Sequence, residues 1–337
     1  MYKTQSSFQN SMFGGFAYKQ IIERNKNHLL VRMINCVDLS FIEDITADCY
    51  CHDNGRRAYH PIIMFKILFL QTLYNESDEK IMEAVDTNIL FRYFVGLSLE
   101  DDIPDRTLLG KFKSRLGENR FNEIFNQIIG IAKEAGLIDN RLRLIDCSAV
   151  KANVDLQRCK KKKKNDNDRT FIDRNTSDPD ASTGYKSPNS KWYGYKSGIM
   201  MDAESEIVTA VETTTAKIAD TDHLENLVRK DQFASGGAKR ICGDKGFLGH
   251  DEFLRGNKIV NNVIRRKNMK QPWRLIYRLD KNIRPIIEHK FAEGKKYHGL
   301  GKAKYWGRWR VHIQSLIIYL TINLKKIVSH LSPIAAH

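Results

Sequence analysis

Residues 140–153 read NRLRLIDCSAVKAN, and an aspartate stands in the middle of this apolar stretch. Leu142 and Leu144 alternate with arginines at a period of two residues, which predicts a β-strand. Asp146 falls near the exit of that strand, although aspartate is depleted in strands because it competes for backbone hydrogen bonds. Two explanations are open: Asp146 forms a turn and Ser148 caps the next segment, or Asp146 is a functional carboxylate.

The stretch ICGDKGF, residues 241–247, repeats this pattern with a second aspartate. Asp244 follows a short apolar strand, and Gly243 and Gly246 beside it allow the backbone to turn sharply. Two strands that end in carboxylates can place these groups side by side at one edge of a sheet. That arrangement is unfavourable unless a divalent cation neutralises the charges, and carboxylate oxygens suit Mg²⁺ or Mn²⁺. The two aspartates therefore predict a metal site.

A third carboxylate comes from a helix predicted over residues 282–293. Its apolar residues recur at helical spacing and form a buried stripe: Ile283, Ile287 and Phe291. Arg284, Glu288 and Lys295 form a second stripe beside the first. A surface ion pair between Arg284 and Glu288, worth a few tenths of a kcal/mol, is the alternative explanation. Residues 281–310 hold nine Lys and Arg against two acids, so we expect Glu288 to face a metal while the cations face phosphates.

The overall composition favours a globular protein with a polyanionic partner. A hydrophobic fraction of 42% over 337 residues is enough for two domains. The 55 Lys and Arg against 40 Asp and Glu give a net charge of +15, which favours nucleic acid; an anionic membrane surface is the alternative. The longest apolar run, residues 313–324, is too short to cross a bilayer, so we expect a buried helix and no membrane partner.

The six cysteines form no CxxC pair, and the first twenty residues contain no apolar signal sequence. Both features predict a reducing, cytoplasmic location. Cys49, Cys51 and His52 suggest zinc, but no second ligand pair has the expected spacing.

The first part of the chain is predicted to be helical. The apolar residues from Ile62 to Leu73 form one helical face, and Pro61 suits the first turn of that helix. Ser77 can cap a second helix, and a basic helix comes next at 108–116. This order is similar to a helix-turn-helix, although short helical pairs are also common in bundles that bind nothing. A further helix ends at Gly136, after which the pattern changes to strands. We therefore expect a helical domain over 1–138 and a second domain over 139–330.

Within the second domain, residues 158–190 are poor in apolar residues and include a lysine run. We expect a flexible basic loop, in which Lys161, Lys162 and Lys163 either contact phosphates or are simply solvated. The remaining segments alternate strands and helices, including a short strand expected at 262–265, which predicts a mixed α/β layer. We assign Asp220, Asp222 and His223 to capping the helix after them. Three tryptophans could stack on a displaced base, but core packing or support on the phosphate side is favoured for each: Trp273, Trp306 and Trp309.

Together these stretches resemble DDE-type insertion-sequence transposases. LIDCSAVKAN resembles the strand of the family's first aspartate, GDKGF that of the second, and RPIIEHKFAEGK the glutamate helix. The family signature has Tyr, Arg, Glu and Lys with two, three and six residues between them. Arg284, Glu288 and Lys295 match its last three positions, whereas Lys281 replaces the tyrosine. The resemblance continues upstream from HPIIMFKILFLQ and downstream through YHGLGKAKYWGRWRVHIQ, and covers most of residues 59–327.

The resemblance implies an α/β fold with a ribonuclease H-like mixed sheet flanked by helices, after an all-α domain that binds DNA or dimerises. Asp146, Asp244 and Glu288 would hold two Mg²⁺ or Mn²⁺ ions, and Arg284 and Lys295 would grip phosphates near the cut. The partners would be double-stranded DNA, both terminal inverted repeats and target, bound by a homodimer at the nucleoid of a prokaryote. The activity would be binding of the element's ends, cleavage, and joining of the 3′-hydroxyl ends to target DNA.

Two other functions remain open. One is a transposase relic that binds DNA without catalysis, although the presence of all three carboxylates argues against it. The other is a ribonuclease H-like nuclease that only hydrolyses. The helical domain and the lysine run favour a protein that must find specific DNA ends.

Overall fold

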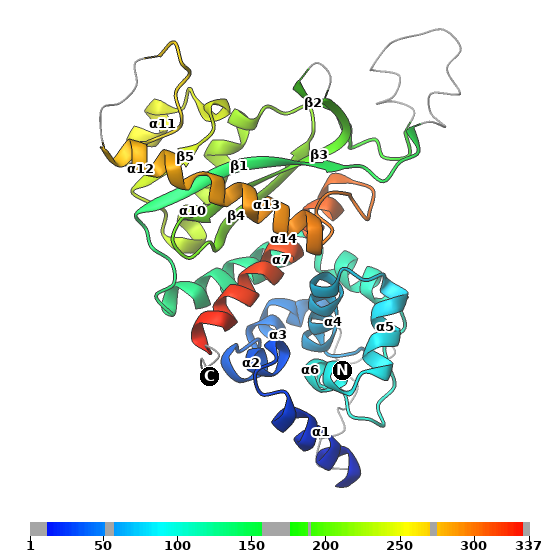
Figure 1. Cartoon of the computed structure of the whole chain (residues 1–337). Helices are drawn as coiled ribbons and strands as arrows, with labels where there is room; N and C mark the ends of the chain where they lie inside the picture. The colour runs from blue at the N-terminus through cyan, green and yellow to red at the C-terminus, as the bar shows by residue number, and fades with distance from the viewer. Residues whose placement is uncertain (1–11, 51–56, 157–175, 188–189, 270–274, 333–337) are drawn as a thin grey trace, which may run out of the picture. The chain divides into compact units, whose positions relative to one another are not determined.

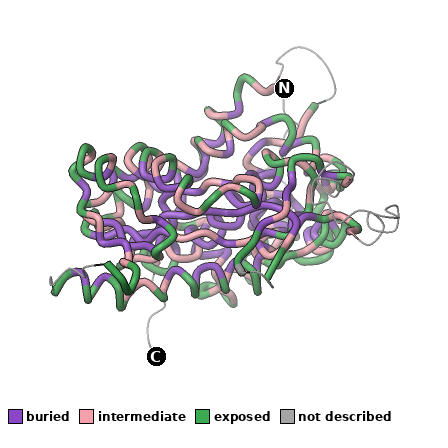
Figure 2. Tube along the Cα trace, turned by 90° about the horizontal axis from the view of Figure 1, so that it is seen from above, coloured by how far each residue is buried: buried purple, intermediate pink, exposed green. Residues whose placement is uncertain are grey.

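The computed structural model describes residues 12–50, 57–156, 176–187, 190–269 and 275–332. The chain divides into two compact units, one formed by Met1–Ile128 with Leu320–His337 and the other by Ile129–Tyr319. Buried and exposed residues alternate along most elements of both units (Figure 2). The functional division at residue 138, between a DNA-binding and a catalytic domain, stays a prediction.

The first unit is helical (Figure 1). Its helices are α1 (Met12–Arg24), α2 (Leu29–Cys36), α3 (Phe41–Thr46), α4 (Pro61–Tyr74), α5 (Asp78–Thr87), α6 (Ile89–Val95), most of α7 (Thr107–Glu134) and the end of α14 (Arg308–Leu331). Pro61 occupies the first turn of α4, where its missing N–H costs nothing, and Asn75 ends the helix in a left-handed conformation. Ser77 caps α5 by accepting a hydrogen bond from the Lys80 amide at 3.2 Å. These predicted helix starts are confirmed.

The helix-turn-helix hypothesis is wrong. Helix α6 and residues 96–106 lie between α5 and the basic start of α7, so no tight turn joins those two helices. Asn88 creates this extra helix by accepting hydrogen bonds from the amides of Leu90 and Phe91. Gly117, at φ 64° and ψ −176°, then kinks α7 where a residue with a side chain would be strained.

The second unit is built on a mixed sheet. Its strands are β1 (Leu142–Lys151), β2 (Ser182–Ser187), β3 (Ser190–Asp202), β4 (Val208–Thr215), β5 (Arg240–Gly243) and β6 (Val260–Asn261). The order is β2-β3-β1-β5-β6, and β4 also pairs with β3. β1 is central, antiparallel to β3 and parallel to β5. Its helices are α10 (Leu224–Ser235), α11 (Asp251–Gly256), α12 (Leu275–Ile283), α13 (Pro285–Tyr297) and the first part of α14.

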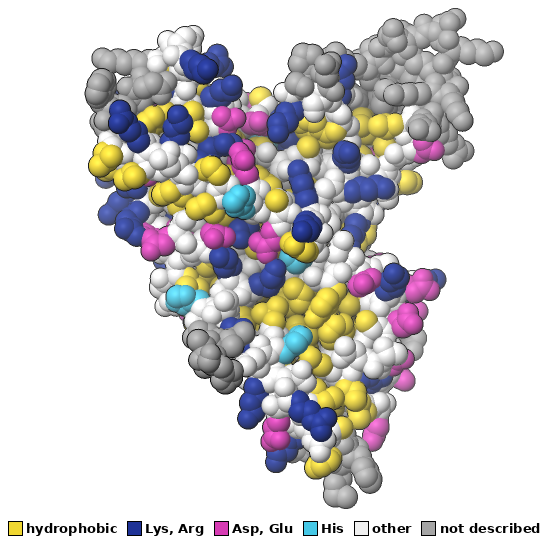
Figure 3. Space-filling view, in the orientation of Figure 1, with side chains coloured by type: hydrophobic (Ala, Val, Ile, Leu, Met, Phe, Trp, Pro, Cys, Tyr) yellow, Lys and Arg dark blue, Asp and Glu magenta, His cyan; other side chains and the backbone are white. Residues whose placement is uncertain are grey.

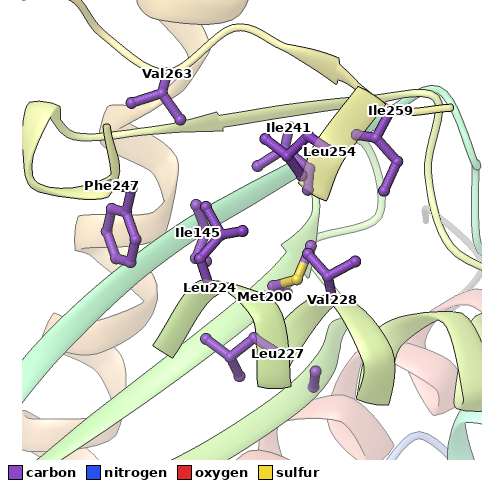
Figure 4. Close-up of a cluster of buried hydrophobic side chains, with 11 residues drawn as sticks. Ile145, Met200, Leu224, Leu227, Val228, Ile241, Phe247, Leu254, Ile259 and Val263 are labelled. Carbon is purple, nitrogen blue, oxygen red and sulfur yellow. The ribbon is translucent and has the colours of Figure 1, made fainter. Parts of the chain in front are cut away.

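The core of this unit lies between the sheet and helices α10 and α11 (Figure 4). Strand residues Ile145, Met200 and Ile241 meet Leu224 and Leu227 of α10 there. Because neighbouring residues of a strand point to opposite faces, Ile145 enters this core and Asp146 points to the face that carries α13. The sheet therefore has a core face below Asp146 and a polar site above it.

Three sequence expectations about this unit need correction. The last part of the loop predicted over 158–190 is not a loop: residues 182–187 form β2, which antiparallel pairing with β3 stabilises. The helix predicted over 282–293 is two helices, because Pro285 cannot continue α12 and instead opens α13. The strand expected at 262–265 lies earlier, at Val260–Asn261, where it pairs with β5.

The apolar run 313–324 is buried within α14, as predicted. Among the described residues, no helix is long and apolar enough to span a bilayer.

Candidate metal and DNA site

The register of the sheet brings the two predicted aspartates together. β1 and β5 pair in parallel with Leu144 opposite Cys242 and Ile145 opposite Gly243. One residue further along, Asp146 and Asp244 therefore lie next to each other at the end of β5. Asp244 is fixed there by accepting a hydrogen bond from the Lys245 amide at 2.7 Å. Asp146 likewise accepts one from the Cys147 amide at 2.8 Å.

Glu288 reaches the same edge through Arg284. The Arg284 guanidinium contacts Asp146 Oδ2 with Nη2 at 3.2 Å and Glu288 Oε1 with Nη1 at 2.9 Å. One side chain thus bridges the strand carboxylate and the helix carboxylate. The ion pair between Arg284 and Glu288 that the sequence suggested is present, and it belongs to this site.

The surroundings of Asp146 disfavour its ionised form and raise its pKa. Its side chain is only 16% exposed. Burial raises the pKa of Asp146 from 3.8 to about 6, and the charges of Asp244 and Asp220 act in the same direction. The Cys147 amide and the Arg284 guanidinium oppose the increase. A cation between Asp146 and Asp244 would relieve this cost.

The residues present fit a hard divalent cation. Asp146 lies in the middle of β1, not near its exit as the sequence suggested, and Asp244 directly follows β5. Carboxylate oxygens on two such neighbouring strands are the donors that Mg²⁺ and Mn²⁺ take, and Glu288, with a side chain 56% exposed, can rotate toward them. In the described ranges no three potential ligand side chains already converge at coordination distance. Arg284 lies between Asp146 and Glu288, so it must move for Glu288 to join the aspartates on one ion.

A fourth carboxylate, Asp220, lies close to the site and was missed. Its Oδ1 lies 2.6 Å from Lys196 Nζ of β3, and its charge reaches Asp146. The capping prediction for Asp220 and His223 is wrong: neither the 3₁₀ turn at Asp220–His223 nor α10 has a side-chain cap hydrogen bond. The sequence offered one indication of this role: Asp220 lies between strand β4 and helix α10, which packs against the sheet that carries Asp146.

His223 is fully buried and serves packing and polar pairing instead. Its Nδ1 lies 2.8 Å from Glu212 Oε2, and its Nε2 lies 2.9 Å from Thr214 Oγ1. These contacts fasten α10 to β4 below the site.

Of the lysines predicted to bind phosphate, the structure describes only Lys295. Lys295 is exposed on α13, where burial, the charge of Lys186 and that of Lys151 lower its pKa and Asp146 raises it. Lys161, Lys162 and Lys163 lie outside the described residues. In the space-filling view, Lys and Arg side chains surround a group of acidic side chains on the visible face of this unit (Figure 3).

Of the two roles favoured for the tryptophans, the structure excludes core packing for Trp306. It is 50% exposed, and its indole N–H donates to the Asn153 carbonyl at 2.9 Å, so the ring is held at the surface. Trp309 is half-buried beneath the Arg310 guanidinium, 4.9 Å from the ring centroid. Trp273 lies outside the described residues.

In the first unit, the basic start of α7 separates into different roles. Lys113 is buried and lies 4.0 Å from Asp78. Lys111 and Arg115 instead line a cavity of about 680 Å³, in which the Arg115 guanidinium lies 4.8 Å from the Tyr50 ring centroid. Of the zinc candidates, Cys51 and His52 lie outside the described residues.

Two family models match the chain. One is described as a transposase domain (DUF772) and matches residues 17–115. The other is described as a transposase DDE domain and matches residues 160–324. Asp244 and Glu288 fall within the second match, whereas Asp146 precedes it. A transposase DDE domain implies the ribonuclease H-like fold, and the mixed sheet with its flanking helices has that architecture, as predicted.

Proposed function

Since the chain belongs to the DDE-type insertion-sequence transposases, we propose that it binds the ends of its own element, cleaves the DNA there and joins the 3′-hydroxyl ends to target DNA. The observation that carries this proposal is the parallel register of β1 and β5, which places Asp146 beside Asp244 with Glu288 one guanidinium away. DNA is the partner that the family and the net charge of +15 both favour.

Asp146, Asp244 and Glu288 would hold the Mg²⁺ or Mn²⁺ ions that the family generally uses. When bound, such ions activate water or a 3′-hydroxyl and stabilise the leaving oxygen. The chain's own contribution is positioning: the amides of Cys147 and Lys245 orient the two aspartates before substrate arrives. Aspartates held on neighbouring strands need little reorganisation during the reaction.

Arg284 and Lys295 would hold the DNA backbone. A guanidinium that now pairs with Asp146 and Glu288 can exchange those carboxylates for phosphate oxygens, using two donors at once. Lys295 lies on α13, seven residues after Glu288, and would contact a neighbouring phosphate. Lys161, Lys162 and Lys163 remain proposed phosphate contacts on the basis of the sequence alone.

The helical residues 1–138 would recognise the element's ends or form the dimer, with the protein acting as a homodimer in the DNA complex in a prokaryotic cytoplasm. Lys111 and Arg115, one helical turn apart at the edge of the α7 cavity, are the described cations suited to DNA in this unit. Lys113 is not, because it is buried against Asp78.

The test uses single substitutions Asp146→Asn, Asp244→Asn and Glu288→Gln, with Glu252→Gln, an exposed acid on α11, as the control. Labelled DNA carrying the terminal inverted repeat is assayed for binding, cleavage and joining in Mg²⁺. We expect all three site variants to bind DNA with near-parent affinity and to lose cleavage. The control Glu252→Gln should both bind and cleave DNA like the parent. Parent protein that only binds would indicate a relic, and parent that cuts without joining would indicate a hydrolytic nuclease.

A further inference from the structure

Lysines from separate segments converge where β1 ends. The amide of Lys151, the last residue of β1, donates to the Gly301 carbonyl at 3.1 Å, and the Ala303 amide donates to the Lys151 carbonyl at 2.7 Å. This pairing makes a bridge between Lys151 and Lys302. Lys295 joins them, because its Cγ lies 3.8 Å from the position a Cβ would take on Gly301.

A fourth lysine comes from β2. Lys186 lies on β2, which pairs with β3, and β3 in turn pairs with β1. The charge of Lys186 and that of Lys151 both act on Lys295, so each of these two ammonium groups lies within electrostatic reach of Lys295. We call Lys151, Lys186, Lys295 and Lys302 the lysine cluster.

No carboxylate in the described part of the chain forms an ion pair with the lysine cluster, although the more distant charge of Asp146 acts on Lys295. All four side chains are exposed, and none forms an ion pair with a carboxylate there. Lys290 of α13, by contrast, is paired, and lies 3.1 Å from both Glu206 and Glu293. Like charges held together without a counter-charge repel one another, and a bound anion removes that cost.

The position of the cluster indicates which anion it takes. The charge of Asp146 acts on Lys295, so the cluster adjoins the carboxylate site. Lys151 lies five positions after Asp146, roughly 16 Å along a strand. That distance spans about five nucleotides of a B-form strand. Lys151 lies an odd number of positions from Asp146, so the link between the carboxylates and the cluster runs through Lys295, on which the charges of Asp146 and Lys151 both act. A DNA strand cut at the carboxylates would reach Lys295 first and the other lysines beyond it.

An exposed aromatic ring lies beside the cluster. The indole N–H of Trp306 is tied to the carbonyl of Asn153, two residues beyond Lys151, and half of the side chain remains exposed. A ring fixed at its edge in this way offers a face on which an unpaired base can stack.

We propose that the lysine cluster and Trp306 bind an unpaired stretch of the DNA strand that leads away from the cut. The lysines neutralise successive phosphates, and the Trp306 ring stacks on a base. This proposal rests on the proposed function of the neighbouring carboxylates, but its contacts need neither metal nor cleavage.

The experiment measures DNA binding by the full-length protein in EDTA, using fluorescence anisotropy. The probes are a labelled duplex with a single-stranded oligothymidine extension and the same duplex with a blunt end. The triple variant Lys151→Gln, Lys186→Gln, Lys302→Gln keeps Lys295 and all carboxylates. A matched triple variant removes three exposed lysines elsewhere in the same unit: Lys133, Lys239 and Lys258, each changed to Gln.

For the cluster variant, we expect weaker binding of the extended duplex and a slope of log K against log salt that is less steep by about two units, at roughly 0.7 per lost phosphate contact. The matched variant should keep most of the slope. Equal losses in the two triple variants would overturn the proposal, because they would reflect net charge alone. An unchanged cluster variant would overturn it as well.

The stacking contact has its own test. Trp306→Leu should weaken binding of the extended duplex at least about fivefold, leave the blunt duplex unaffected, and be largely rescued by Trp306→Phe. Equal losses on both probes would refute a role for an unpaired base. Because all these measurements are made without metal, the cluster can fail while Asp244→Asn still abolishes cleavage. Conversely, the cluster can bind DNA in a protein that never cleaves.

Discussion

Asp146→Asn should make the metal-free protein more stable, because it removes a buried charge that nothing fully compensates. The pKa of Asp146 is raised from 3.8 to about 6, so above pH 6 the ionised side chain costs about 3 kcal/mol relative to the unfolded chain, at 1.36 kcal/mol per unit. Because the pKa of this carboxyl is higher in the folded than in the unfolded chain, the free energy of unfolding decreases as pH increases from 3.8 to 6, and the full cost is present at pH 8.

The expected gain is smaller than this cost. Asn leaves Arg284 with Glu288 as its remaining charged partner here, and that loss offsets part of the relief. We expect the free energy of unfolding to rise by about 1–2 kcal/mol at pH 8 in EDTA. Urea unfolding followed by circular dichroism measures it, with Asp251→Asn, an exposed acid at the start of α11, as the control.

The same pair of proteins is then melted in Mn²⁺. Parent should gain thermal stability, because a ligand that binds only the folded state stabilises it by mass action, and Asp146→Asn should gain much less. The turn-forming explanation predicts no difference between the two proteins, since Asn also forms turns. A destabilised variant in EDTA, or equal Mn²⁺ shifts in both proteins, would refute the reasoning.

Three further predictions concern the folded framework. Lys66→Met should raise the free energy of unfolding at pH 7 by at most about 3 kcal/mol, because burial lowers the pKa of Lys66 from 10.5 to about 8. The parent regains stability as pH rises from 8 to 10.5, so the difference between the two proteins in urea unfolding should shrink over that range. A constant difference would contradict the burial argument. Arg143→Met should cost about 3–5 kcal/mol in the same assay, because two buried aspartates at 2.7 and 2.9 Å lose their cation; a loss below about 1 kcal/mol would show that the pairs contribute little. Gly194→Ala should unfold the sheet or abolish soluble expression, because its Cβ would lie 2.2 Å from the Val150 carbonyl oxygen; a stable variant with parent-like hydrogen exchange in β1 would exclude that contact.

Local patterns alone singled out the three carboxylates proposed for the site. Asp146 and Asp244 each stood out because an acid at the end of an apolar strand is locally unfavourable. Glu288 was found from the helical spacing of Ile287 and Phe291, both of which are buried in α13. The pattern could not supply the register, because strand pairing joins residues almost a hundred positions apart.

The residues that were missed depend on such long-range pairing. Lys295 of the lysine cluster was predicted to contact phosphate, but Lys151, Lys186 and Lys302 were missed, because each alone resembles a solvated surface residue. The bridge between the segment after α13 and the end of β1 brings Lys302 to Lys151. Asp220 was assigned to a helix cap because Asp before a helix usually caps it, yet Lys196 of a neighbouring strand binds it instead. Helix α6 was missed because seven residues are too few to show a period.

The central claim is that Asp146, Asp244 and Glu288 hold the catalytic cation beside the paired strands β1 and β5. Crystals of the protein with Mn²⁺ and a DNA end, measured near the manganese absorption edge, test it most directly. We expect an anomalous peak within about 2.3 Å of both aspartate carboxylates, with Glu288 turned toward the site and Arg284 moved onto a phosphate. Anomalous peaks only elsewhere, while the same crystals contain cleaved DNA, would contradict the assignment.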